Sequence, residues 1–197
     1  GFVNGLTGFG TGMTALVLWL HVLAPAVAAP LVVVCSVVAQ LQSLPAIRHA
    51  IDLRRLAPFV GGGLLGIPAG AWLLLRVSVP DLKFWLGGLI AAYCAFMLAA
   101  RSRIRVSGGG RMADAAVGLG GGVLGGLAGL SGPLPTIWAG LRGWSKDERR
   151  AVFQGFNLTI LGVSLLAHAA AGLMTVELGR AVAWALPGTL LGAAVGQ

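Results

Sequence analysis

Two apolar segments of this chain are dense in glycine and carry hydroxyl side chains between the glycines. They cover residues 1–12 and 122–133, and neither contains Asp, Glu, Lys or Arg. Glycine lets a ligand approach the backbone, and the exposed N–H groups of a broken helix favour an anion. We therefore expect an anion-binding site without charged side chains. Its two walls would be Thr7, Gly8, Gly10, Thr11 and Gly12, and Gly129, Ser131, Gly132 and Pro133.

Close packing of helices through small residues is the alternative interpretation of these glycines. Pro133 and Pro135 favour binding, because they introduce a break in the helix that packing alone does not need. Gln154 and Asn157 lie three residues apart and so share one helix face. Buried amides are costly unless they are satisfied, so these two either line the site or join helices. His168 is a candidate proton relay, with a hydrogen-bonded helix contact as its alternative.

A second kind of chemistry is suggested by residues 129–132, which read G-x-S-G. Together with His168 they resemble the Ser–His dyad of rhomboid intramembrane proteases. The first glycine segment carries Phe9-Gly10-Thr11 at the same place, so the motif follows from a glycine repeat and not from a need for serine. A serine hydrolase using Ser131 and His168 therefore stays an alternative only. We expect no enzyme activity and no cofactor. Cys35 and Cys94 are isolated in apolar runs, so we expect no metal site either.

The composition requires a membrane setting for these residues. The chain is 57% hydrophobic and only 10% charged, whereas soluble domains are about 25% charged. Spanning helices need about 20 apolar residues, and seven such segments are predicted, at about 1–20, 25–46, 56–75, 81–100, 113–141, 151–173 and 179–197. The run 115–141 is longer than one span needs, so we expect a helix, a break and a second short helix there. The first segment would be broken in the same way at 8–12.

The two halves of the chain repeat one pattern. At an offset of 121, Gly1, Gly5 and Gly8 fall on Gly122, Gly126 and Gly129. At an offset of 126, Gly62, Gly66 and Gly70 fall on Gly188, Gly192 and Gly196. This predicts transmembrane repeats at 1–111 and 112–197, and two broken segments related by a repeat point to a transporter's binding site. The second repeat would be incomplete, so we expect both ends to be trimmed and an eighth span to follow residue 197.

The net charge of +8 does not indicate nucleic acid, because the basic residues occupy short loops between apolar runs. Loops after the second, fourth and sixth segments hold eight basic residues against six in the others, if each segment crosses once. That difference is too small to fix the orientation. The acidic residues all lie at or near loop ends, which favours an anionic or neutral cargo over a cation.

The pattern G-x-x-x-G-L-T-G-F-G-x-G at 1–12 resembles the N-terminal signature of the sulfite exporter TauE/SafE family, and G-G-L-A-G-L-S-G at 125–132 resembles its second signature. The resemblance covers essentially the whole chain, although Pro133 stands where a further glycine is common. It implies a multi-pass protein of the bacterial inner membrane with seven or eight spans. It also implies a secondary carrier, without ATP, for sulfite, sulfonates or related small anions.

Together these observations predict an all-α polytopic membrane protein built from two repeats with glycine-rich broken helices. Its partners would be a small anionic substrate and the lipid bilayer, with no nucleic acid. A passive anion channel is a further alternative. The identity of the anion, the direction of transport, ion coupling and the oligomeric state, including a homo-oligomer, stay open.

Overall fold

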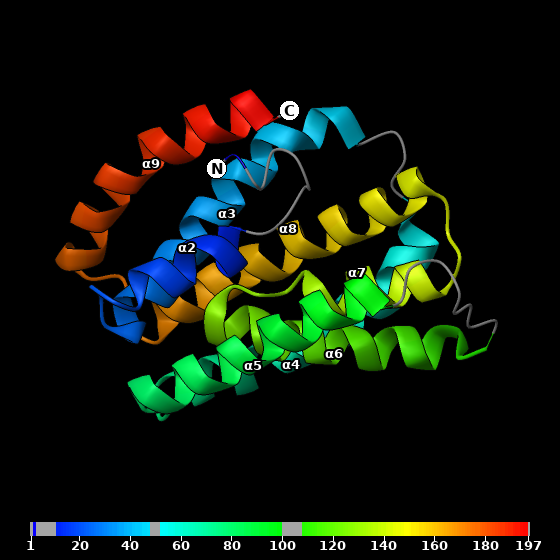
Figure 1. The fold of residues 1–197 in the computed structure, drawn as a ribbon, viewed down its shortest axis with the longest axis horizontal. Helices are drawn as coiled ribbons and strands as arrows, with labels where there is room; N and C mark the ends of the chain where they lie inside the picture. The colour runs from blue at the N-terminus through cyan, green and yellow to red at the C-terminus, as the bar shows by residue number, and fades with distance from the viewer. Residues whose placement is uncertain (1, 3–10, 48–51, 100–107, 197) are drawn as a thin grey trace.

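The computed structural model describes residues 2, 11–47, 52–99 and 108–196. This part of the chain is helical and contains no strand. Its elements are α2 (Thr11–Trp19), α3 (Pro25–Ile47), α4 (Leu53–Leu74), α5 (Val79–Ala99), α6 (Gly110–Ala128), α7 (Pro133–Leu141), α8 (Lys146–Ala170) and α9 (Val176–Gly196). Figure 1 shows them running roughly lengthwise, with α9 at one edge beside α3.

The structure confirms the predicted all-α fold of a membrane protein for the described residues. Four of the described helices are long and apolar enough to cross a bilayer, namely α3, α4, α8 and α9. The count of seven spans and the division into repeats at residue 111 stay predictions, since length and apolarity single out these four alone among the described residues.

Helices α4 and α6 pack through glycines at backbone contact. A Cβ atom on Gly62, Gly66 or Gly70 would overlap the carbonyl oxygens of Ala115, Leu119 and Val123 in α6. In return, Cβ atoms on Gly118, Gly122 and Gly126 would meet the carbonyls of Phe59, Gly63 and Ile67 in α4. The contacts advance in the same direction on both helices, so α4 and α6 are parallel. Small residues every fourth position thus allow the close approach that membrane helices use.

The predicted counterpart of α4 in the second repeat packs differently. A Cβ atom added to Gly188 of α9 would find no neighbouring atom within 4 Å. Its helix lies mainly against α3, through Val27, Leu31 and Leu178. Gly188 therefore does not have the packing role that its counterpart Gly62 has in α4.

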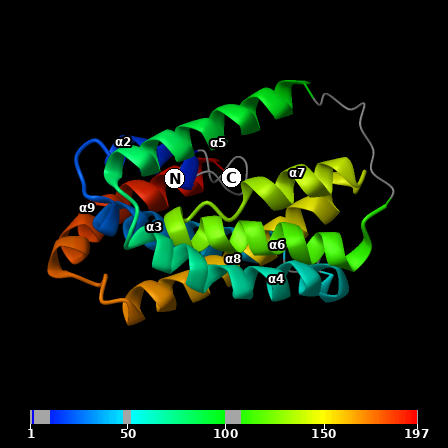
Figure 2. The same ribbon diagram turned by 90° about the horizontal axis from the view of Figure 1, so that it is seen from below.

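Helix α7 turns back alongside α6, so residues 110–141 form a helical hairpin (Figure 2). The Trp138 Nε1–H donates to Asp114 Oδ1 at 2.6 Å, and Arg142 donates to the Gly108 carbonyl at 2.7 Å. The C-terminus of α7 therefore lies beside the N-terminus of α6. The predicted sequence of helix, break and short helix is confirmed.

This hairpin changes the count of basic residues at the two ends of the molecule. If each predicted segment crossed the membrane once, residues 142–145 would lie at the opposite end from the start of α6, but the hairpin places them at the same end. We call this the basic end, where α4, α6 and α8 begin and α7 ends. It holds seven of the ten described Lys and Arg residues, namely Arg54, Arg55, Arg111, Arg142, Lys146, Arg149 and Arg150.

Candidate functional site

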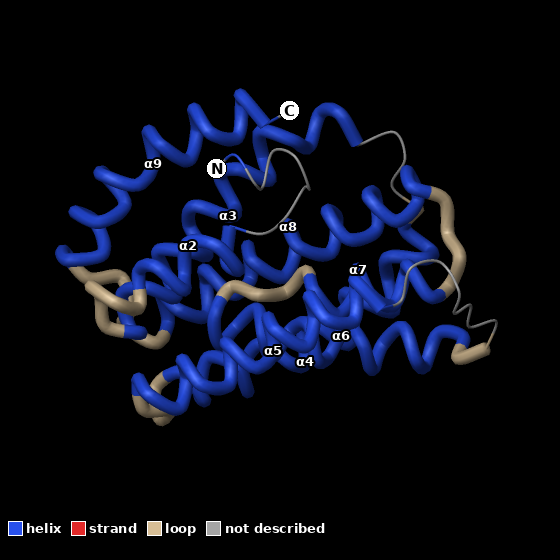
Figure 3. Tube along the Cα trace, in the orientation of Figure 1, coloured by secondary structure: helices blue, strands red, loops and turns tan. Residues whose placement is uncertain are grey.

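The break between α6 and α7 covers residues 129–132, drawn as a loop in Figure 3. All four residues are buried. Gly129 ends α6 with φ at +67°, a left-handed conformation that L side chains rarely adopt. Its N–H donates to the Gly125 carbonyl at 2.9 Å, and the Leu130 N–H donates to the Leu124 carbonyl at 3.1 Å. Pro133 then opens α7, since a proline at the first helical position loses no hydrogen bond.

The break leaves a small number of backbone donors without partners. None of the backbone hydrogen bonds in the described chain uses the N–H groups of Ser131, Gly132 or Leu134. Pro133 and Pro135 have no N–H at all, so the start of α7 offers fewer donors than a helix N-terminus usually does. Buried N–H groups are nearly always bonded to something, which makes these three candidates for binding a ligand or water.

A side-chain hydrogen bond ties the break to the middle of α8. Ser131 Oγ donates to Asn157 Oδ1 at 2.8 Å, with both residues at most 2% exposed. Ser131 can approach α6 this closely because glycines face it. A Cβ on Gly125 would lie 3.2 Å from the Ser131 Cβ, and one on Gly121 would lie 3.0 Å from the Ser131 carbonyl oxygen.

Gln154 lies one turn before Asn157 on the same face of α8 and is 1% exposed. Neither its Nε2 nor its Oε1 has a hydrogen-bond partner among the described residues. An unpaired buried amide costs free energy on the order of 1–3 kcal/mol for each group. This side chain therefore has unused capacity to donate to or accept from a bound molecule.

His168 lies apart from this cluster. It is buried, and its Nε2 lies 2.7 Å from the Gly126 carbonyl, which can only accept, so Nε2 carries the proton in this contact. His168 follows Asn157 by eleven positions, which corresponds to about 16 Å along the helix. Ser131, bonded to Asn157, has no hydrogen bond to His168, so the Ser–His arrangement that a hydrolase needs is not formed in this structure.

The structure places only part of the predicted site. It brings Ser131 of the predicted second wall into contact with Asn157 of α8. Gly129, Gly132 and Pro133 of the same wall lie beside Ser131 at the break between α6 and α7. Thr7, Gly8 and Gly10 lie outside the described residues. Thr11 and Gly12 open α2.

Sequence reasoning missed Ser164, which is fully buried and whose Oγ has no partner. It lies on α8 between Asn157 and His168, and its Oγ is 3.7 Å from a Cβ position on Gly125. The spacing of 154, 157, 164 and 168 keeps to one helix face, and this periodicity could have identified it.

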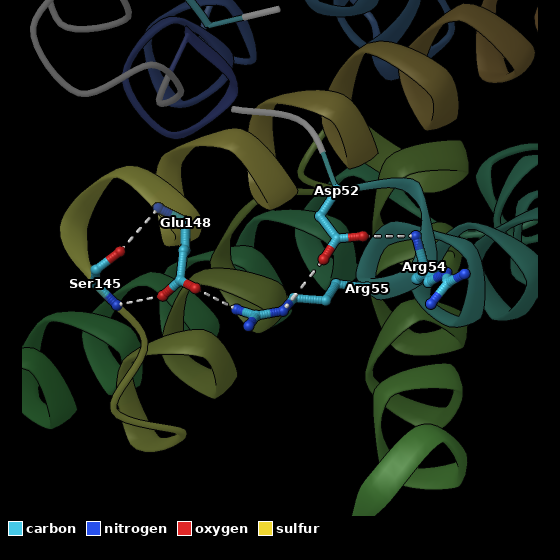
Figure 4. Close-up of polar contacts among 5 residues, drawn as sticks. All are labelled: Asp52, Arg54, Arg55, Ser145 and Glu148. Atoms are coloured by element: carbon cyan, nitrogen blue, oxygen red, sulfur yellow. Dashed lines mark hydrogen bonds and ion pairs between the residues drawn. The ribbon is translucent and has the colours of Figure 1, made fainter. Parts of the chain in front are cut away.

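At the basic end, α4 and α8 are joined by an ion pair. Arg55 reaches Glu148 at 2.7 Å and Asp52 at 3.5 Å, as Figure 4 shows. Asp52 caps α4 by accepting from the Arg54 N–H, and Ser145 and Glu148 form a capping box that starts α8. A cavity of about 430 Å³ opens beside these groups, and four arginines lie among its lining residues, Arg54, Arg55, Arg111 and Arg142.

Comparison with known proteins identifies the family of this chain. No curated protein and no solved structure matches it. The family model described as Sulfite exporter TauE/SafE matches residues 1–197, the whole chain. The second glycine signature that carries the resemblance is the segment that forms the break between α6 and α7. The protein is therefore a member of the sulfite exporter TauE/SafE family, a family of membrane transporters.

Proposed function

We propose that this protein is a secondary transporter of a small sulfur-containing anion, such as sulfite or an organosulfonate. The anion would bind at the break between α6 and α7, near the middle of α8. The observation that carries this proposal is the buried Gln154 amide, which has no hydrogen-bond partner among the described residues. Gln154 lies on the same face of α8 as Asn157, and Asn157 is hydrogen-bonded to Ser131 in the break.

The groups at this place suit an oxyanion. The N–H groups of Ser131 and Gly132 and the Nε2 of Gln154 are donors that no described residue uses. Asp114, a buried carboxylate of α6, is near the basic end and accepts from Trp138. Neutral donors can hold an anion in a low-dielectric site without the desolvation cost of a buried cation.

The asymmetry of basic residues supports an orientation in the membrane. Cytoplasmic loops are enriched in Lys and Arg, and the basic end holds seven of the ten that are described. We therefore propose that the basic end faces the cytoplasm. The bacterial inner membrane is proposed as the location on the strength of the family, which is one of membrane transporters.

His168 is proposed as the proton relay of this carrier. Its Nδ1 is buried without a partner, one turn from the unpaired Ser164 Oγ. A water molecule between these two groups would satisfy both, and it would continue the polar side chains of α8 beyond Asn157.

The test is flux of sulfite into proteoliposomes, with and without an imposed pH gradient. Gln154→Leu removes the unpaired amide, and we expect it to lower saturable flux about tenfold or more. Thr159→Val, also in α8, is the matched control, because the Thr159 hydroxyl only donates to the Gly155 carbonyl of its own helix. Flux that never saturates would indicate a channel, and normal saturable flux through the Gln154 variant would refute this site.

A further inference from the structure

One face of α8 carries polar side chains over most of its length. Relative to Arg150, the residues Gln154, Asn157, Ser164 and His168 all point within about 40°, at about 100° of rotation per residue. We call these five residues the polar face of α8. Four of them are fully or almost fully buried, and Arg150 is half-buried where the helix begins.

Arg150 is the charged member of this face. Its Nε is buried without a hydrogen-bond partner, and neither ion pair of the described residues involves it. Side chains on a helix lean toward its N-terminus, so the guanidinium lies at the basic end, on the N-terminal side of Gln154. A guanidinium stays ionised, and a partly buried charge without a counter-ion is unfavourable. An anion that enters from the basic end would supply the missing partner.

Arg149 is adjacent to Arg150 and occupies a different face of α8. It also has a buried Nε without a partner, but its Nη1 lies 3.9 Å from a Cβ position on Gly140 of α7. The residues that follow on its side of α8 are apolar, namely Phe153, Phe156 and Ile160. The two arginines thus carry the same charge and are adjacent near the start of α8, but only Arg150 belongs to the polar face.

We infer that Arg150 selects the cargo by charge and is the first contact of the oxyanion on its way to Gln154 and Asn157. Neutral donors alone would also bind uncharged molecules that carry hydrogen-bond acceptors. A guanidinium instead favours an anion with two oxygens, to which it can donate two parallel hydrogen bonds. Sulfite and the sulfonate group have this geometry. This inference rests on the proposed transport function and adds a specificity residue to it.

The experiment uses the full-length protein in proteoliposomes, with sulfite as the probe, and compares Arg150→Gln, Arg150→Lys and Arg149→Gln with wild type. A parallel titration of sulfite onto each detergent-solubilised protein measures binding directly. We expect Arg150→Gln to raise the half-saturating concentration roughly tenfold or more with a smaller change in maximal rate. Arg150→Lys should recover part of the loss, and Arg149→Gln should resemble wild type.

Either of two results would overturn this inference and leave the proposed transport function standing. If wild type binds and moves sulfite, and Arg150→Gln does so with the same half-saturation, the inference is overturned and the transport function stands. Equal losses in Arg149→Gln would also overturn it, because general charge at the basic end would then be enough. If wild type neither binds nor moves sulfite, both are refuted for this anion.

Discussion

Ser131 donates a hydrogen bond of 2.8 Å to Asn157, and this contact joins the break between α6 and α7 to the middle of α8. The two residues lie 26 positions apart and are both buried. A broken backbone inside a membrane protein must be satisfied by neighbouring groups. This bond therefore positions the break, and with it the unpaired Gln154 amide one turn away.

Asn157→Leu should leave the Ser131 hydroxyl buried without its acceptor. We expect a loss of stability of about 1–3 kcal/mol together with lower sulfite flux. Thermal unfolding in detergent measures the first and proteoliposome flux the second. In the double variant Ser131→Ala/Asn157→Leu the two losses should be clearly less than additive. Full additivity would mean that the two side chains do not interact.

Gly66→Ala should destabilise the protein, because its Cβ would overlap the backbone of α6 at Leu119. Overpacking of this kind costs about 1–3 kcal/mol or more. Gly61 of the same helix has open space around it, so Gly61→Ala should be neutral or stabilising by up to about 1 kcal/mol. Yield of monodisperse protein and the unfolding midpoint distinguish the two, and equal behaviour would contradict the glycine packing of α4 and α6.

His168→Gln keeps a donor for the Gly126 carbonyl and removes the titrating imidazole. If His168 relays protons, sulfite flux through this variant should lose most of its response to an imposed pH gradient while the unfolding midpoint changes little. A variant with normal gradient response and lowered stability would show that His168 serves as a helix contact alone. His168→Ala, which cannot make the bond, provides the comparison for stability.

The assigned orientation can be checked with single cysteines in a background that lacks Cys35 and Cys94. Gly108→Cys lies next to α6 at the basic end, and Ala171→Cys follows α8 at the opposite end. We expect a membrane-impermeant maleimide to label Ala171→Cys in spheroplasts, and Gly108→Cys only after the membrane is opened. The reverse pattern would place the basic end outside.

Most helices of the described chain could be predicted from the sequence, because apolar runs of about 20 residues between charged loops have few other solutions. The break at 129–132 was also predictable, since Gly129, Pro133 and Pro135 act locally on the backbone. The partner of each glycine was not. Gly66 and Gly188 belong to the same sequence echo, yet the first contacts α6 and the second has open space around it.

The sequence by itself determined that this protein is a helical membrane protein of the TauE/SafE family with a break in a glycine-rich segment, because hydrophobicity and backbone freedom are local properties. The tertiary structure decided that α7 returns along α6, and it thereby gathered most of the described basic residues at one end. It also decided that Ser131 bonds to Asn157 and not to His168, and that Gln154 lies buried without a partner. These relations depend on which helix faces meet, and that is fixed by packing between segments far apart in the chain.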